Sequence, residues 1–572
     1  MATTASGTSS GDSAAPRGWG TPGVRAAIIG TSLIGLALRL WILFTAGLMS
    51  VTQYDDGPYF GSAVRLIHGV LPYRDYAFVQ PPGITELMSP AALESYLGGT
   101  AWALVIGRFL CVFAGTAAVV LAGFLVRHRG ALAVLLTGGI IAIYPPAAAS
   151  ARTVLLEPWL VLFCLAGAVA VFDGDRLTSR TRRLLWGGVA FGFGGAIKVW
   201  AIVPVLVIIV LCLSRPRALL VPPPRSAPAP ARRPPPLCLP HVRRAAVFAG
   251  GVAAGFLIPV LPFVIAAPGR FYDDVVVAQL ARIGTRTAAW KRLNTMLGTP
   301  KVLSPTTVVV LAITVVAVVI AAQIAASLVT GRRPAPLDWF AMVSAALIVA
   351  IFLWPPYYAA HYAAFLGPFL ALSVALPVAR LAEGLATRRA TAGQPVAPDQ
   401  PAAPQATPWL AGAGLVVLGL AVLAGAAAQA APPGQSMARF DVPTVTLRMV
   451  PKGSCVLTDS AAYLLIADRF TSDVPGCSQM VDSLGTDLAL GDGRRPGSGA
   501  GRVPAVSQAW HQAFSTAGWV LLSPKSSVRI PWNPALRAYF QSHFRLARHM
   551  NTYTLYVRDG IRPKLQKLHT AG

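Results

Sequence analysis

The sequence has 572 residues, of which 55% are hydrophobic and only 12% are charged. Soluble globular proteins carry about 25% charged residues, so this composition excludes an ordinary soluble domain. The formal net charge of +26 does not indicate binding of nucleic acid. The arginines lie in short segments between hydrophobic runs, and they form no basic stripe with interleaved aromatic side chains.

Long hydrophobic runs indicate helices that cross a lipid bilayer. A bilayer core of about 30 Å takes about 20 apolar residues as helix, and unpaired backbone groups are costly in lipid, so the runs must be helical. Residues 1–23 are rich in Gly, Ser, Thr and Ala and predict a disordered cytoplasmic tail. The run at 24–50 is longer than the apolar region of a signal peptide, and we interpret it as the first span. Eleven spans are predicted in all, with later runs near 101–126, 131–148, 154–172, 184–197, 199–214, 245–267, 305–329, 338–354, 361–380 and 408–430.

Lys198 separates two short hydrophobic runs. The flanking halves at 184–197 and 199–214 form either two short helices that meet at a break or one long helix. We favour two helices, because an odd number of spans then gives a consistent topology. The expected fold is therefore a polytopic α-helical membrane domain at 24–430.

The arginines indicate which side of the membrane each loop faces, because cytoplasmic loops carry an excess of Lys and Arg. With the N-terminus inside, the inner loops carry the larger share, at Arg127, Arg129, Arg176, Arg180, Arg182, Arg183, Arg332, Arg333 and Arg380 and between Arg215 and Arg244. The last span then leads residues 431–572 to the extracytoplasmic side.

Residues 431–572 differ in character from the hydrophobic runs. Strand-like segments lie near 455–459, 519–524 and 554–560, and helix-like segments near 460–470 and 534–546. This alternation predicts a small α/β domain. Cys455 and Cys477 are the only cysteines in the region. We predict that they form a disulfide, which also favours an oxidising, extracytoplasmic location.

The first outer loop, residues 51–100, carries the most informative motif. It begins VTQYDDGPYFGSAVRLIHGVLPYRDYAFVQPPGITEL. Asp55 and Asp56 follow directly on the first hydrophobic run, where carboxylates serve either as solvated helix caps or as functional groups. The apolar residues Phe60, Ala63, Val64 and Ile67 recur at helical spacing. This spacing predicts an amphipathic helix along the membrane surface, which would hold both carboxylates at the depth of a lipid headgroup.

The order of motifs in this part of the chain resembles the GT-C glycosyltransferases. An acidic pair after the first helix is followed by a surface helix, by Gly-x-x-Pro-Tyr-Arg-Asp ending at Asp75, and by Gln-Pro-Pro beginning at Gln80. The pattern is similar to the branch with protein O-mannosyltransferases and lipid A aminoarabinose transferases. Three later features match that branch, namely Leu156-Glu157-Pro158, Lys198 at its break, and His361-Tyr362 at the start of a late helix.

The resemblance covers roughly residues 30–380 and leaves the sugar open. The acidic pair here is Asp-Asp. This is the pair of actinobacterial arabinosyltransferases, whereas the mannosyltransferase-like branch usually has Asp-Glu.

The resemblance implies a donor sugar carried on a polyprenyl phosphate, with the phosphate as leaving group and inversion at the anomeric carbon. It implies that an aspartate of the outer loop takes the proton of the acceptor hydroxyl. We therefore predict Asp55 as the general base, with Asp56 as its orienting partner or as a metal ligand. Substrate-binding residues are predicted at Arg65, Arg74, Asp75, Gln80, Glu157, Lys198 and His361. This set agrees with the chemistry, because a base must reach the acceptor proton and a departing phosphate needs cations nearby.

Each of these candidates has a structural alternative. Glu157 could form an ion pair with Arg152, Lys198 could extend to the membrane interface, and His361 could be an ordinary interfacial histidine. The second acidic pair, at Asp273 and Asp274, is more typical of a solvated surface. The tyrosines Tyr357, Tyr358 and Tyr362 are typical of an interfacial aromatic belt.

The sequence predicts no resident cofactor. It has no Cys/His cluster at zinc spacing, and neither a P-loop nor a dinucleotide-binding fingerprint. A divalent cation between the acidic pair and the donor phosphate is left open.

The function expected from the sequence is an inverting glycosyltransferase at the outer face of the plasma membrane. Its acceptor would be a hydroxyl group of an envelope glycan, a glycolipid or a protein. The alternatives are a transporter or flippase of a lipid-linked saccharide, and a scaffold protein without catalysis. The charged residues gather at the outer edge rather than at the bilayer midplane, which favours surface chemistry over transport.

Overall fold

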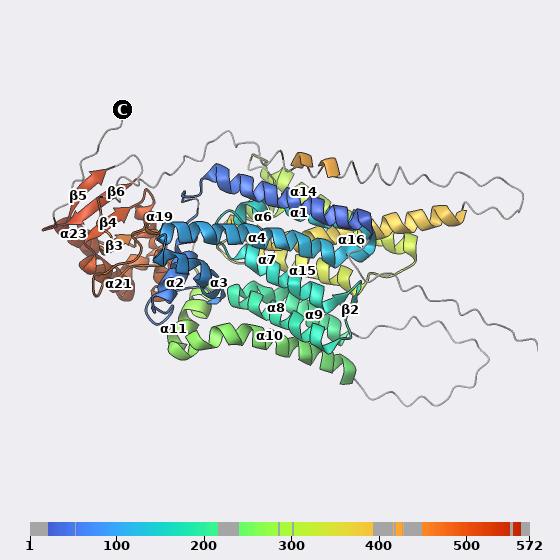
Figure 1. Ribbon diagram of the computed structural model, residues 1–572, viewed down its shortest axis with the longest axis horizontal. Coiled ribbons are helices and arrows are strands. Elements are labelled where there is room, and N and C mark those ends of the chain that lie inside the picture. The colour runs from blue at the N-terminus through green and yellow to red at the C-terminus, as the bar shows by residue number, and fades with distance from the viewer. Residues whose placement is uncertain are drawn as a thin grey trace, which may run out of the picture.

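The structure is a computed structural model that describes residues 21–51, 53–214, 239–283, 286–299, 302–392, 449–549 and 553–561, with single positions between 416 and 427. A bundle of roughly parallel and antiparallel helices forms most of the molecule, and a small α/β domain sits at one end of it (Figure 1). The predicted run at 408–430 falls largely outside the described residues.

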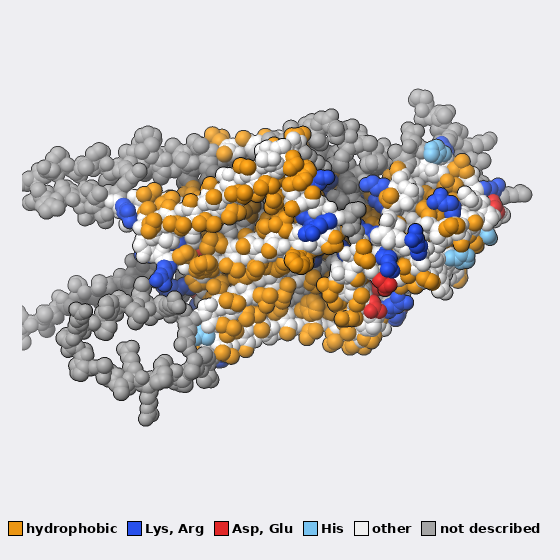
Figure 2. All heavy atoms as spheres, turned by 180° about the vertical axis from the view of Figure 1, so that it is seen from behind, with side chains coloured by type: hydrophobic (Ala, Val, Ile, Leu, Met, Phe, Trp, Pro, Cys, Tyr) orange, Lys and Arg blue, Asp and Glu red, His pale blue; other side chains and the backbone are white. Residues whose placement is uncertain are grey.

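The predicted hydrophobic runs that lie in the described part are helices. They are α1 (Pro22–Ala46), α4 (Thr100–Val126), α5 (Gly130–Ile143), α7 (Glu157–Val171), α8 (Thr181–Ile197), α9 (Ile202–Leu213), α10 (Leu239–Ala266), α14 (Pro305–Thr330), α15 (Pro336–Leu353) and α16 (Ala363–Ala392). Within the described ranges, six helical stretches are long and apolar enough to cross a membrane, and 157–171 and 199–213 are shorter apolar helices. Hydrophobic side chains cover the outside of the bundle (Figure 2). The chain is therefore a multi-pass membrane protein.

Helices α8 and α9 meet at the Lys198 break and run in opposite directions. Lys198 lies against Glu157, the first residue of α7. Ser214, which follows α9, lies at the other end of the bundle, where it lines a cavity of about 970 Å³ with Arg176 and Arg333. The structure thus has two helices at this position, as favoured from the sequence.

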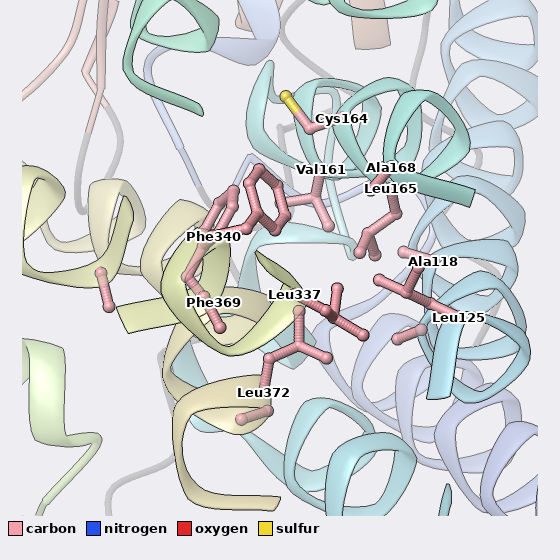
Figure 3. Close-up of a cluster of buried hydrophobic side chains, with 14 of the residues drawn as sticks. Ala118, Leu125, Val161, Cys164, Leu165, Ala168, Leu337, Phe340, Phe369 and Leu372 are labelled. Atoms are coloured by element: carbon pink, nitrogen blue, oxygen red, sulfur yellow. The ribbon is translucent and has the colours of Figure 1, made fainter. Parts of the chain in front are cut away.

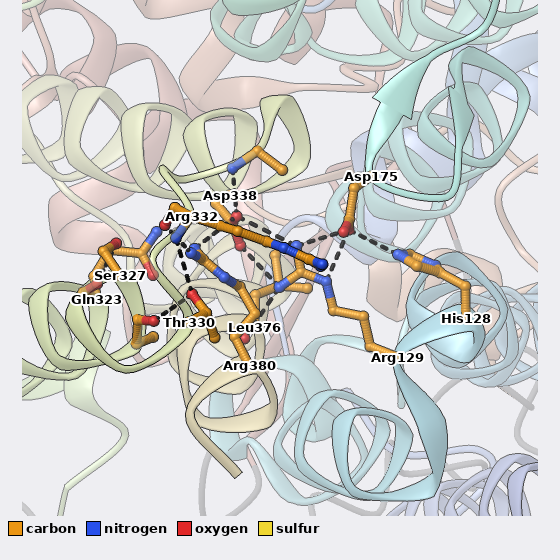
Figure 4. A network of polar contacts seen from close by, with 12 residues as sticks. His128, Arg129, Asp175, Gln323, Ser327, Thr330, Arg332, Asp338, Leu376 and Arg380 are labelled. Atoms are coloured by element: carbon orange, nitrogen blue, oxygen red, sulfur yellow. Dashed lines mark hydrogen bonds and ion pairs between the residues drawn. The ribbon is translucent and has the colours of Figure 1, made fainter. Parts of the chain in front are cut away.

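The interior of the bundle is apolar, with a polar network near one end. Leu337, Phe340, Phe369 and Leu372 pack between α7, α4, α15 and α16 (Figure 3). At the end opposite the α/β domain, Arg129 contacts Asp175 at 2.7 Å and Asp338 at 3.0 Å (Figure 4). Arg380 and His128 complete this network, which ties α15 and α16 to the turn between α4 and α5.

The first outer loop forms α2 (Asp56–Ile67) and α3 (Gly83–Ala92). The predicted helix is present as α2, but it is not exposed at a surface, because every residue from Asp56 to Val64 is buried. The α/β domain covers the helix. A Cβ atom on Gly57 would lie 2.5 Å from the backbone nitrogen of Ala462, so only glycine permits this approach.

The C-terminal domain has a four-stranded mixed sheet in the order β3-β4-β6-β5. Strand β3 (Val456–Thr458) pairs parallel with β4 (Trp519–Leu522), and β6 (Thr554–Arg558) pairs antiparallel with both β4 and β5 (Phe544–His549). Its helices include α19 (Ala462–Ile466), α20 (Ser483–Leu490), α21 (Pro504–Thr516) and α23 (Pro534–His543). A disulfide joins Cys455 to Cys477, whose Cα atoms are 5.6 Å apart.

Candidate active site

A cavity of about 320 Å³ lies where the helical bundle meets the α/β domain. Four parts of the chain far apart in sequence form its walls: the first outer loop, the segment at Arg282, the segment before α16, and residues 482–495 in and around α20. Its lining includes Tyr54, Asp55, Tyr59, Gln80, Arg282, Tyr357, His361, Tyr362, Asp482 and Arg495.

Asp55 is the carboxylate that faces this cavity from the first loop. It immediately precedes α2 and its side chain is 27% exposed. The nearest ionic partner is His361, whose Nε2 lies 3.9 Å from Oδ2 of Asp55. Burial raises the pKa of the Asp55 carboxyl above its ordinary value of 3.8, and His361 opposes this rise. Asp55 is therefore a carboxylate that holds a proton more readily than a solvated one.

Asp56 points away from the cavity into the protein. Its Oδ2 accepts a hydrogen bond of 2.6 Å from Arg108, and its Oδ1 accepts one of 2.7 Å from the backbone of Val154. Arg108 also donates to the carbonyl groups of Leu48 and Ser50. Successive helical residues point about 100° apart, so the two aspartates diverge. This geometry does not support the predicted role of Asp56 beside Asp55 and assigns it to anchoring of the loop.

Behind Asp55 lies a buried charge network. Lys198 Nζ is 2.6 Å from Glu157 Oε1, and His361 Nε2 is 3.9 Å from the same oxygen. Lys198 also lies 3.7 Å from the ring centre of Trp200 and 4.1 Å from that of Tyr362. Glu157 thus pairs with Lys198 rather than with Arg152, and Lys198 is buried rather than extended to the interface.

The remaining predicted residues divide between two places. Gln80 lines the cavity with Asp55. Arg65, Arg74 and Asp75 lie outside it and line a second cavity of about 530 Å³. There Arg74 and Asp75 form an ion pair of 2.8 Å with solvent-accessible side chains.

Asp274 holds the loop that carries Gln80. Its Oδ2 accepts a hydrogen bond of 2.9 Å from the backbone of Phe78. Asp274 is buried, contrary to the expected solvated surface, and burial raises its pKa to about 7. Asp274 is therefore a support for the first loop, whereas Asp273 is exposed as expected.

The sequence did not reveal that the C-terminal domain lines the cavity. Asp482 caps α20 by accepting from Gly485, and it accepts a hydrogen bond of 2.8 Å from the Tyr54 hydroxyl. Burial raises the pKa of Asp482 to about 6. Arg495 stacks over the ring of Tyr357 at 3.9 Å, so Tyr357 belongs to the site rather than to an aromatic belt. No local motif marks these residues, because their role depends on tertiary contacts.

In the part of the chain that the structure describes, no group of three or more His, Cys, Asp or Glu residues is placed to hold a metal ion. Positive charge at the cavity comes from the arginine side chains Arg282 and Arg495, which line it.

Comparison with known proteins identifies the class. Residues 93–219 match the family described as dolichyl-phosphate-mannose-protein mannosyltransferase. Searching by sequence against curated proteins gives no match. The fold is similar to that of ArnT from Cupriavidus metallidurans bound to undecaprenyl phosphate, with 14% identity, a TM-score of 0.54, and coverage of 92% of this chain and 97% of that chain. The apo state of that protein matches with 13% identity, a TM-score of 0.50 and the same coverage.

These matches confirm the resemblance predicted from the sequence. The family match rests on residues other than the first-loop motif from which the resemblance was predicted. The matched segment begins after the first-loop motif and contains Glu157 and Lys198, while the structural likeness shows the fold of nearly the whole chain. The chain thus resembles the GT-C membrane glycosyltransferases in its fold, and its residues 93–219 match the dolichyl-phosphate-mannose-protein mannosyltransferase family.

Proposed function

We propose that the protein transfers a sugar from a polyprenyl-phosphate donor to an acceptor hydroxyl, with inversion, at the extracytoplasmic face of the plasma membrane. One observation carries the assignment of the base. Among the described residues, the Asp55 carboxylate accepts no hydrogen bond, whereas the carboxylates of Asp56, Glu157 and Asp482 each have a donor within 2.8 Å. Asp55 is thus free to accept the proton of an incoming hydroxyl.

The same cavity contains cationic side chains that suit a departing phosphate. Arg282 and Arg495 line it together with Asp55, and guanidinium groups bind phosphate oxygens through paired hydrogen bonds. The donor class is supported by the structural relative of the same fold, which was solved with undecaprenyl phosphate bound.

The proposed step is a single displacement. The acceptor oxygen forms a bond to the anomeric carbon, and the bond from that carbon to the phosphate oxygen breaks. The hydroxyl proton passes to Asp55, and the electron pair leaves with the polyprenyl phosphate. Arg282 and Arg495 stabilise the charge that develops on the phosphate. Attack from the side opposite the leaving group inverts the anomeric centre.

The two ends of the bundle support the proposed orientation. The end opposite the cavity carries His128, Arg129 and Arg380 in one network and Arg176 and Arg333 around a cavity. Such an arginine-rich end is typical of the cytoplasmic side. The disulfide lies in the domain at the other end, which favours an oxidising compartment there.

The proposal is tested by transfer assays on the purified full-length protein in sealed proteoliposomes. Radiolabelled polyprenyl-phosphate mannose and arabinose serve as donors, with membrane extracts as acceptors. Asp55→Asn should reduce transfer by about 10²- to 10⁴-fold. The control is Asp492→Asn, because the Asp492 side chain is 83% exposed and lies outside the cavity. Unchanged transfer by Asp55→Asn would remove the assigned base, and movement of the donor across the bilayer without transfer would favour a flippase.

A further inference from the structure

The second cavity, of about 530 Å³, lies between the first outer loop and the C-terminal domain. Its volume falls within the range of about 300–1,000 Å³ that is usual for ligand sites. Helix α20 separates it from the cavity that contains Asp55. Leu484 and Leu488 of α20 line the Asp55 cavity, whereas Thr486 and Leu490 line the second one. A ligand held in the second cavity is therefore one helix away from the proposed base.

A buried and unsatisfied amide marks the second cavity as a binding site. Gln479 lines the cavity and is only 7% exposed. Neither the nitrogen nor the oxygen of its side-chain amide has a hydrogen-bond partner within the described ranges. Buried polar groups in proteins are nearly always paired, and this amide offers two donors and one acceptor to a ligand.

The other polar groups around Gln479 narrow the chemistry of that ligand. Arg65 has a buried Nε without a partner in the described part of the chain, and Thr486 and Gln512 add further donors and acceptors. Asp274 also lines this cavity, and a carboxylate disfavours a highly charged anion. The other charged residues that line this cavity are Arg74, Arg270 and Asp75, so three cationic side chains lie beside two carboxyl groups and the net charge is small. Hydroxyl, amide and carboxyl groups with a small net charge match the hydroxyl groups of a saccharide.

We propose that this second cavity binds sugar residues of a glycan acceptor, so that the acceptor chain extends over α20 to present its hydroxyl to Asp55. The inference rests on the proposed transfer reaction and adds the acceptor class to it. Gln479 and Arg65 contact the bound saccharide, and neither takes part in the chemical step.

Binding is measured on the full-length protein in nanodiscs by ligand-observed NMR. The probes are α-linked mannotriose and arabinotriose as neutral saccharides, and inorganic phosphate as an anion. A trisaccharide should bind the wild type and Asp55→Asn equally, and Gln479→Leu should weaken it about tenfold through loss of its hydrogen bonds. Gln323→Leu is the matched control. Gln323 is also 7% exposed and its amide has no hydrogen-bond partner among the described residues, but it lies in α14. In transfer assays, Gln479→Leu should raise the KM for the acceptor and leave the KM for the donor unchanged.

Several outcomes would overturn the inference. They are the absence of trisaccharide binding, equal weakening by Gln323→Leu, and binding of phosphate alone. Thermal unfolding shows whether Gln479→Leu folds. If it does not fold, Gln512→Trp is the variant that tests saccharide binding. Gln512 is exposed on α21, and a large side chain there narrows the cavity. Unchanged trisaccharide affinity in Gln512→Trp would then refute the site. Failure of the proposed reaction gives a different result, in which Asp55→Asn keeps its transfer activity.

Discussion

Asp55 and Asp56 are neighbours in sequence with opposite environments. Asp55 faces the cavity and accepts no hydrogen bond from the residues that the structure describes, whereas Asp56 is buried against Arg108. The sequence identifies the pair as important but does not separate the two roles, because the partner of Asp56 comes from α4, 52 residues away. The same limit applies to Glu157, for which Arg152 is near in sequence but Lys198 is near in space.

At the residue scale, the pH dependence of transfer should report on Asp55. The base must be deprotonated, and burial raises its pKa, so the acidic limb of kcat/KM should lie above the ordinary 3.8. His361 lowers the pKa of Asp55. His361→Asn should therefore move the acidic limb to higher pH, as measured from kcat/KM across the acidic range. His128→Asn, at the opposite end of the bundle, should leave the limb in place. A limb that stays in place in His361→Asn would contradict the assignment of Asp55.

The anchoring role of Asp56 predicts a loss of stability. Asp56→Asn leaves the Arg108 guanidinium buried without its counter-charge, which costs about 3–5 kcal/mol. Thermal unfolding in detergent should show a clearly lower Tm. The exposed pair of Arg74 and Asp75 provides the control, since Asp75→Asn should cost at most about 1 kcal/mol. An Asp56→Asn protein with an unchanged Tm but no transfer would instead support a catalytic role.

At the scale of elements, close packing of α8 against α10 positions Lys198. Cβ atoms on Gly188 or Gly251 would clash with backbone atoms of the facing helix. Hydrophobic periodicity predicts both helices. It does not predict that they pack against each other, because this packing depends on contacts at the glycines. Strand β5 was missed for a related reason, because Phe544–His549 continues a predicted helix and becomes a strand only by pairing with β6.

Adjacent glycines on α10 provide a test of this packing. Gly251→Ala places a methyl group against the carbonyl of Leu185, and such overpacking costs about 1–3 kcal/mol. Gly250→Ala meets no atom within 4 Å, so it should not lower the Tm. Because α8 ends at Lys198, Gly251→Ala should also reduce transfer. Equal Tm values for the two variants would show that the helices tolerate separation.

At the scale of the whole molecule, the predicted topology depends on charge and on the disulfide. Composition and hydropathy were sufficient to predict a polytopic membrane domain, and the resemblance of the first-loop motifs added the GT-C fold. They were not sufficient to predict that the C-terminal domain covers α2 and contributes Asp482 to the cavity. Contacts between distant parts of a chain leave no local signal in one sequence.

The proposed orientation predicts which positions an impermeant thiol reagent reaches. Ser527→Cys, exposed in the C-terminal domain, should be labelled in intact cells. Ser179→Cys, exposed at the arginine-rich end, should be labelled only after the membrane is permeabilised. The background carries Cys238→Ser, and Cys111, Cys164 and Cys212 are buried. The reverse pattern would place the Asp55 cavity in the cytosol and overturn the proposal.

The hydrogen bond between Tyr54 and Asp482 joins residues that are 428 positions apart. A ribosome makes Tyr54 early and Asp482 near the end of translation. Under the proposed function and orientation, the nascent protein has no complete reaction centre until its last domain has crossed the bilayer and folded. Transfer activity would then arise only on the side of the membrane where the C-terminal domain folds. Unfinished chains would not react with isoprenoid-linked sugars during biosynthesis.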